Sequence, residues 1–168
     1  MSATPKRNQA CALAKSDPKQ ALTKARSVTN PWFRAQALSW VARFTDANPL
    51  PIAKMAAKAA SLCDDDYSRS AVRAWEIAAL AGRNLEAEAR KVLTAAVRVA
   101  ETVEPISSRS IALFRLFQAA YSISRKDAGF VLERLEALCP EEEHWRCRRS
   151  RRNAHRIMDQ GIAPRSFF

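Results

Sequence analysis

The residues most suited to chemistry in this sequence form a dense run of arginines. Guanidinium groups bind phosphate and carboxylate through paired hydrogen bonds, so the run suggests anion binding. On a helix of about 100° per residue, Cys147, Ser150, Ala154, Ile157 and Met158 share one narrow arc. We therefore expect an amphipathic helix with a basic outer face, which either binds anions or keeps a terminal helix soluble. The arginines are Arg146, Arg148, Arg149, Arg151, Arg152 and Arg156.

Cysteine and histidine lie close to the same run. Cys139, His144 and Cys147 have the spacing of three zinc ligands, but structural zinc needs a fourth. His155 lies about 12 Å beyond Cys147 along a continuous helix, too far to complete the set. We expect no metal site and buried thiols. A reactive Cys147, activated by its neighbouring arginines and paired with His144, is the less favoured alternative.

Other catalytic patterns are missing. The glycines are Gly82, Gly129 and Gly161 alone, which excludes a glycine-rich phosphate loop and a dinucleotide fingerprint. The sequence has neither His-Glu-x-x-His nor Gly-x-Ser-x-Gly. We therefore expect a protein that is not an enzyme and that needs no cofactor.

The net charge of +11 is unevenly distributed. Residues 1–63 hold 10 basic and 2 acidic side chains, residues 64–140 hold 11 of each, and residues 141–168 hold 7 basic and 4 acidic. Two basic ends around a neutral middle favour an anionic partner: nucleic acid, an acidic protein or anionic lipid. Solubility alone is the alternative explanation.

The sequence also predicts a cytoplasmic location. No signal peptide is recognisable, and no apolar stretch approaches the roughly 18 residues of a membrane span. Four scattered cysteines without a CxxC pair do not suggest a disulfide framework.

Helical periodicity runs through nearly the whole chain. The 32 alanines favour helix, and apolar residues recur at steps of three and four, as from Leu85 to Val103. Asp17-Pro18, Asn30-Pro31 and Glu104-Pro105 each predict a helix start. Three more prolines are expected between helices, namely Pro49, Pro51 and Pro140.

The helices form a repeat marked by arginine. Each unit has an alanine-rich helix, an acidic or proline-containing turn, and a second helix that begins near an arginine. The marker arginines are spaced 35, 40 and 37 residues apart. We expect them to cap the turns or to form ion pairs there; a row that binds anions is the alternative. They are Arg34, Arg69, Arg109 and Arg146.

One unit carries a family resemblance. Trp32-Phe33-Arg34-Ala35-Gln36-Ala37-Leu38, after an Ala-x-x-x-Ala helix and an Asn-Pro turn, resembles degenerate tetratricopeptide-like or HEAT-like repeats. The resemblance covers roughly residues 17–158, with spacing less regular than the ~34 residues of a strict tetratricopeptide repeat and without its Trp–Leu–Gly signature. It implies a stacked helical-hairpin scaffold that binds proteins or peptides, and it implies no catalytic residue.

The expected fold is all-α, a right-handed α–α superhelix of about four helical hairpins. Residues 1–16 should be a basic, partly helical N-terminal segment, residues 17–160 one helical-repeat domain, and residues 161–168 a flexible C-terminal tail. Within that tail, Phe167-Phe168 is either frayed or a docking peptide. Large aromatic residues should fill the layers between helices: Trp40, Trp75, Phe114, Phe117 and Phe130.

The function expected from these observations is that of a non-catalytic scaffold for an acidic protein or peptide. The alternative is a nucleic-acid-binding helical repeat that uses the basic N-terminal third and the arginine helix.

Overall fold

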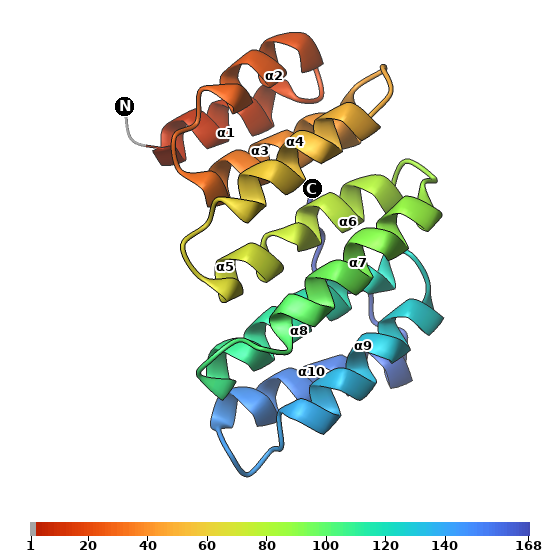
Figure 1. Ribbon diagram of the computed structural model, residues 1–168. Coiled ribbons are helices and arrows are strands. Elements are labelled where there is room, and N and C mark those ends of the chain that lie inside the picture. The colour runs from red at the N-terminus through yellow and green to blue at the C-terminus, as the bar shows by residue number, and fades with distance from the viewer. Residues whose placement is uncertain (1–2) are drawn as a thin grey trace.

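The computed structural model describes residues 3–168, and over these residues the chain is helical with no strand (Figure 1). Only Val72, itself in a helical conformation, separates α5 from α6, so the two form one bent helix and the described chain has nine helices in all. The all-α class expected from the sequence is therefore confirmed. The segments are α1 (Ala3–Leu13), α2 (Pro18–Arg26), α3 (Pro31–Phe44), α4 (Leu50–Ser61), α5 (Asp66–Ala71), α6 (Arg73–Ala81), α7 (Glu86–Ala100), α8 (Ile106–Tyr121), α9 (Arg125–Leu138) and α10 (Trp145–Gln160).

The helices lie in two rows (Figure 1). The A row consists of α1, α3, α5–α6, α8 and α10, and each of its helices packs against the next. The B row consists of α2, α4, α7 and α9, and each of these packs against the A-row helix that precedes it in the chain. The result is four sequential helical hairpins, followed by α10, which packs against α8 and α9.

The predicted helix starts are partly correct. Asp17 accepts a hydrogen bond from Gln20 N at 2.9 Å, and Asn30 accepts one from Phe33 N at 3.1 Å, so both cap helices that begin with proline. The third predicted start is displaced, because α8 begins at Ile106, after Pro105. Pro51 was expected between helices but lies in the first turn of α4, where the missing N–H costs no helical hydrogen bond.

Alanine makes up much of the core. The buried apolar residues form two clusters: one lies mainly within α1–α4 and includes Val72 and Ala79, and the other lies mainly within α5–α10 and includes Ala53 of α4. Trp32 and Trp75 pack against both. In α10 the predicted stripe is largely confirmed, since Cys147, Ser150, Ala154 and Ile157 are buried and Met158 is half-buried.

The prediction for the large aromatic residues is confirmed fully for Phe117 and in part for the other four, which pack against the core clusters. Phe117 is fully buried, whereas Trp40, Trp75, Phe114 and Phe130 are only half-buried. Small alanine side chains make up much of the core, and these four rings pack against it from its margins. Three of them, Trp40, Trp75 and Phe114, line surface pockets.

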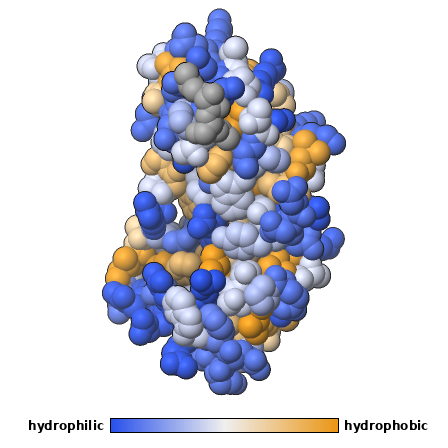
Figure 2. All heavy atoms as spheres, turned by 90° about the vertical axis from the view of Figure 1, so that its left-hand side faces the viewer, coloured by the Kyte–Doolittle hydropathy of each residue, from blue (hydrophilic) through white to orange (hydrophobic). Residues whose placement is uncertain are grey.

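The remaining surface is largely hydrophilic. Figure 2 shows hydrophilic residues over most of one side, with only separated apolar groups among them. Within residues 4–168, the large hydrophobic side chains that are exposed are Leu62, Trp145 and Ile162. No helix of the described chain is long and apolar enough to cross a membrane.

Candidate binding groove

Three marker arginines hold the turns between the two rows. Each donates from Nε to the backbone carbonyl six residues earlier, where the preceding B-row helix has just ended. The acceptors Val28, Cys63 and Val103 are buried, so their carbonyls need a protein partner. The distances are 2.6 Å for Arg34, 2.9 Å for Arg69 and 3.0 Å for Arg109.

Acidic residues and further carbonyls complete these turns. Arg69 pairs with Asp66 at 3.0 Å, and Arg109 pairs with Glu104. Arg109 also donates to Leu138 O at 3.3 Å and so joins its own turn to the end of α9. Arg34, Arg69 and Arg109 therefore make contacts of the kind expected for arginines that cap turns.

Arg146 differs from the other markers. The last turn has one residue more, so Arg146 follows the buried Cys139 by seven positions, where Arg69 follows Cys63 by six. The Arg146 guanidinium instead lies 5.3 Å from the ring centre of Trp145. This leaves it available at the surface of α10.

The six arginines of α10 point in different directions. Arg146, Arg149 and Arg156 line pockets on the A-row side. Arg148 and Arg152 are exposed, and Arg151 turns to the preceding loop, where its Nε lies 3.8 Å from Glu141 Oε1. The single basic face expected from the sequence is therefore divided, with half of its arginines at the pockets.

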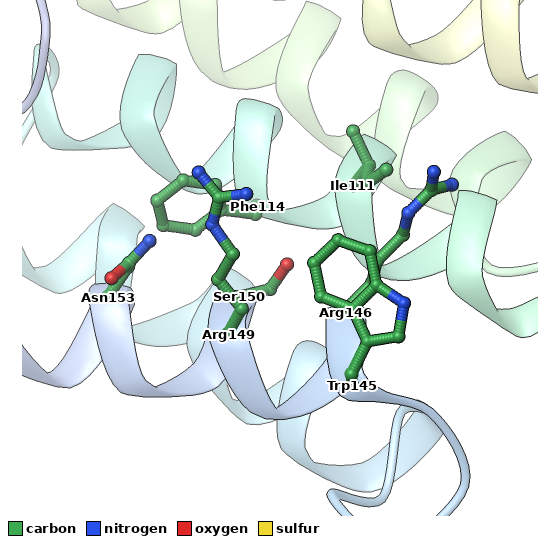
Figure 3. Close-up of a pocket in the computed structure, with 7 residues that line it drawn as sticks. All are labelled: Ile111, Phe114, Trp145, Arg146, Arg149, Ser150 and Asn153. Carbon is green, nitrogen blue, oxygen red and sulfur yellow. The ribbon is translucent and has the colours of Figure 1, made fainter.

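The first pocket lies between α8 and α10. Figure 3 shows Arg146 and Arg149 extending from α10 toward α8, with the Trp145 ring beside them. Ile111 and Phe114 of α8 form the opposite wall, and the volume is about 230 Å³. A half-exposed indole between two guanidinium groups can stack on a flat group while hydrogen-bonding an anion.

Three further pockets continue from this one along the A row. Neighbouring pockets share lining residues. Phe114 and Asn153 line both the first pocket and the second, and Gln118 and Arg165 line the second, third and fourth pockets. We call this run of pockets the A-row groove. Its lining from the body of the protein includes Trp40, Arg43, Trp75, Phe114, Arg115 and Gln118.

Cations lie over aromatic rings along the groove. Arg115 Cζ is 5.1 Å from the ring centre of Trp75. Lys15 Nζ and Arg43 Cζ are 4.9 Å and 5.4 Å from that of Phe44. Such contacts hold long basic side chains against the surface and keep their charge at the groove.

Most charged side chains of the A-row helices are basic, and the exceptions are Asp66 on α5, Glu76 on α6 and Asp159 on α10. α1, α3 and α8 together contain six basic residues and no acidic residue. On α6 the acidic residue is Glu76, which is buried and bonded to Arg73 at 2.5 Å and 3.2 Å. Burial raises the pKa of Glu76, although Arg73 opposes the shift. The groove is therefore an electropositive surface with aromatic side chains.

The C-terminal segment, residues 161–168, crosses this groove. It leaves α10 at Gly161 and runs back along the A row, so that the chain end lies near α6 (Figure 1). Phe167 contacts Trp75, with ring centres 5.4 Å apart, and Phe168 contacts Trp40 at 5.3 Å. The segment has no regular secondary structure, and the flexibility expected for it stays a prediction.

The histidines and cysteines serve local structure. His144 Nδ1 accepts from Arg146 N at 3.1 Å and caps α10, while His155 Nε2 lies 2.7 Å from Glu136 Oε1. Burial raises the pKa of the Cys139 thiol to about 12, and the adjacent Cys147 adds to the shift. Cys147 is fully buried and faces the core. No cluster of three or more metal-ligating side chains occurs in the described chain.

The groove was not predicted from the sequence, although the spacing of its residues contains a signal for it. Trp40 and Trp75 each lie six residues after a marker arginine, and Arg115 has the same offset from Arg109. Aligning the units on the marker arginines places these three side chains on one face of successive A-row helices. Comparisons of the chain with protein-family models, with curated proteins and with solved structures find no significant match.

Proposed function

We propose that the protein is a non-catalytic scaffold that binds an acidic protein or peptide in the A-row groove. In this proposal the two rows form a right-handed superhelix of the tetratricopeptide-like or HEAT-like type. The observation that carries the proposal is the groove itself, in which basic and aromatic side chains alternate over successive A-row helices without an acidic side chain in its lining.

The chemistry of the groove suits a peptide better than a small molecule. The pockets are open and adjoin one another over several helices, and a seven-residue stretch of this chain already lies among them. Arginines on aromatic rings offer carboxylates a charge-assisted hydrogen bond from a pre-positioned donor. A partner with carboxylates along an extended segment would match this series.

A pull-down with groove variants tests the proposal. Tagged wild-type chain should recover its partner after nuclease treatment, and a chain with Arg115→Glu and Arg149→Glu should not. Neither arginine forms an ion pair in the described chain, so their reversal should leave the fold intact. The matched control is Arg98→Glu, an exposed residue of α7 in the B row. Loss of recovery on nuclease treatment, or equal recovery by all variants, would contradict the proposal.

The alternative function is nucleic-acid binding by the basic ends. The half-exposed Trp145 between Arg146 and Arg149 supports it, because single strands bind where bases stack on aromatic rings beside basic groups. A fluorescent oligothymidylate should then bind with an affinity that falls steeply with salt. Reversing the charges of Arg148, Arg149, Arg151 and Arg152 should abolish that binding. Absence of binding at ~50 mM salt would exclude the alternative.

A further inference from the structure

Two aromatic subsites lie next to each other in the A-row groove. In the first, Phe167 meets Trp75 edge-on at 81°, and Arg115 lies against the same indole. In the second, Phe168 meets Trp40 and Phe44, with ring centres 5.3 Å and 6.1 Å away. Edge-to-face geometry at these distances is the favourable arrangement for aromatic pairs.

The two subsites belong to different parts of the core. Phe167 packs against the cluster of α5–α10, and Phe168 packs against the cluster of α1–α4. Neighbouring residues of an extended chain point in opposite directions, so two consecutive aromatic residues can reach both subsites at once. The spacing of the subsites therefore matches a pair of adjacent aromatic side chains.

The present occupant is held by these rings and not by its backbone. Within the described chain, the hydrogen bonds of residues 161–168 run between Ser166 and Phe168. Its backbone adds no strand or helix to the body of the protein. An occupant anchored by side chains alone can be exchanged for another with similar side chains.

The occupant also has the wrong charge for the groove. Arg165 lines a pocket together with Arg7 and Arg115, and no carboxylate lines that pocket. Three guanidinium groups around one cavity repel one another. Residues 161–168 therefore fit the aromatic subsites, but their Arg165 is unfavourable beside Arg7 and Arg115. A peptide with a carboxylate at the place of Arg165 would satisfy both.

We propose that the A-row groove binds an extended acidic peptide with two consecutive aromatic residues, and that residues 161–168 occupy the groove until such a peptide displaces them. This inference rests on the proposed function and specifies the partner. The aromatic pair would take the positions of Phe167 and Phe168, and the acidic residue before it would lie between Arg7 and Arg115.

Fluorescence anisotropy with three labelled peptides tests the proposal. The first peptide has the sequence of residues 161–168, the second carries Arg165→Glu, and the third carries Arg165→Glu with Phe167→Ala and Phe168→Ala. Each is titrated with the wild-type chain and with a chain in which Phe167→Ala and Phe168→Ala have freed the groove. Both phenylalanines are outside the helices, so this variant should keep the wild-type helical circular dichroism.

Three results are expected. The freed chain should bind the Arg165→Glu peptide about fivefold more tightly than the unchanged peptide, with a difference that shrinks as salt is added. Loss of both rings should weaken binding by about tenfold or more. The wild-type chain should bind the acidic aromatic peptide more weakly than the freed chain does, because its own segment competes.

Each contrary result would overturn one part of this proposal. Equal affinity of the first two peptides would remove the acidic requirement, and equal affinity of the last two would remove the aromatic subsites. Equal binding by both chains would show that residues 161–168 do not occupy the groove. If the peptide without rings binds as well as the aromatic one and Arg115→Glu weakens the binding of both, the scaffold still binds acidic peptides but has no aromatic subsites. The proposed function would then stand and this inference would fall. If no acidic peptide binds and the pull-down also fails, both proposals fall.

Discussion

The marker arginines perform two different tasks in this protein. The number of residues between each arginine and the preceding buried carbonyl decides which task it performs. At six residues from a buried carbonyl, as in Arg34, Arg69 and Arg109, its Nε reaches back and closes the turn. At seven residues, Arg146 does not reach and lies on Trp145 at the groove. Lysine cannot replace arginine in closing the turn, because one ammonium group lacks the fork of donors that several fixed carbonyls require.

Arg109 should be the most sensitive of these residues. It donates to Val103 O and Leu138 O and pairs with Glu104, and its side chain is only 16% exposed. Arg109→Lys should lower the free energy of unfolding by about 2 kcal/mol, because carbonyls away from water lose their donor. Urea titration measures the change. The matched control Arg146→Lys should cost less than about 0.5 kcal/mol, and similar losses for the two would contradict the assignment.

The buried Cys139 thiol should make stability depend on alkaline pH. The pKa of the thiol is about 12 in the folded chain against an ordinary value of 9.0, so the folded chain binds more protons between these values. Its contribution is complete below pH 9 and decreases above it, by about 1 kcal/mol at pH 10. In urea titrations from pH 8 to pH 10, Cys139→Ala should lose stability less steeply than wild type. Parallel pH profiles would refute the prediction.

At the scale of elements, the ends of helices decide where the chain goes next. Asn84 and Gly161 follow α6 and α10 with positive φ angles of 58° and 62°. A left-handed residue ends a helix and turns the chain sharply, and asparagine and glycine tolerate this conformation best. At Gly161 the turn sends residues 161–168 back across the A row.

Gly161→Ala should therefore destabilise the protein through its backbone alone. No atom lies within 4 Å of the position that a Cβ would take, so the substitution adds strain and no clash. We expect a loss of about 1 kcal/mol in thermal or urea unfolding. Gly161→Asn should recover part of this loss, because its side chain tolerates positive φ. Equal losses for alanine and asparagine would indicate another cause.

Local signals predicted the elements well and the groove poorly. The caps at Asp17 and Asn30 and the buried stripe of α10 depend on residues close in sequence, which periodicity and capping rules describe. The half-buried positions of Trp40 and Trp75 depend on how helices far apart in sequence pack together, which no local pattern describes. The path of residues 161–168 depends on contacts with residues more than 90 positions earlier.

At the scale of the whole molecule, two indole rings pack against both hydrophobic clusters. Trp32 and Trp75 pack against both clusters, with their ring centres 6.0 Å apart, and Trp32 also stacks on Tyr67 at 6.1 Å. These rings couple the N-terminal and C-terminal helices. The same Trp75 is the subsite for Phe167, so occupancy of the groove and coupling of the two halves involve one side chain.

Removing Trp75 should consequently separate the two halves in unfolding. In the wild-type chain, slow amide hydrogen exchange in α3–α4 and in α8–α9 should report the same global free energy. Trp75→Ala should reduce protection in α3–α4 more than in α8–α9, because the N-terminal cluster has fewer helices and loses its link to the larger one. Mass spectrometry of exchange in these helices gives the two values in one experiment.

Phe130→Ala provides the comparison for this experiment. Phe130 is also a half-buried aromatic residue, but it packs against the cluster of α5–α10 alone. Because the link at Trp75 remains, its removal should lower protection in both halves by the same amount, whatever the total loss. A common decrease for Trp75→Ala as well would show that the halves are joined elsewhere. Unequal decreases for Trp75→Ala alone would establish this indole as a connection between the two halves.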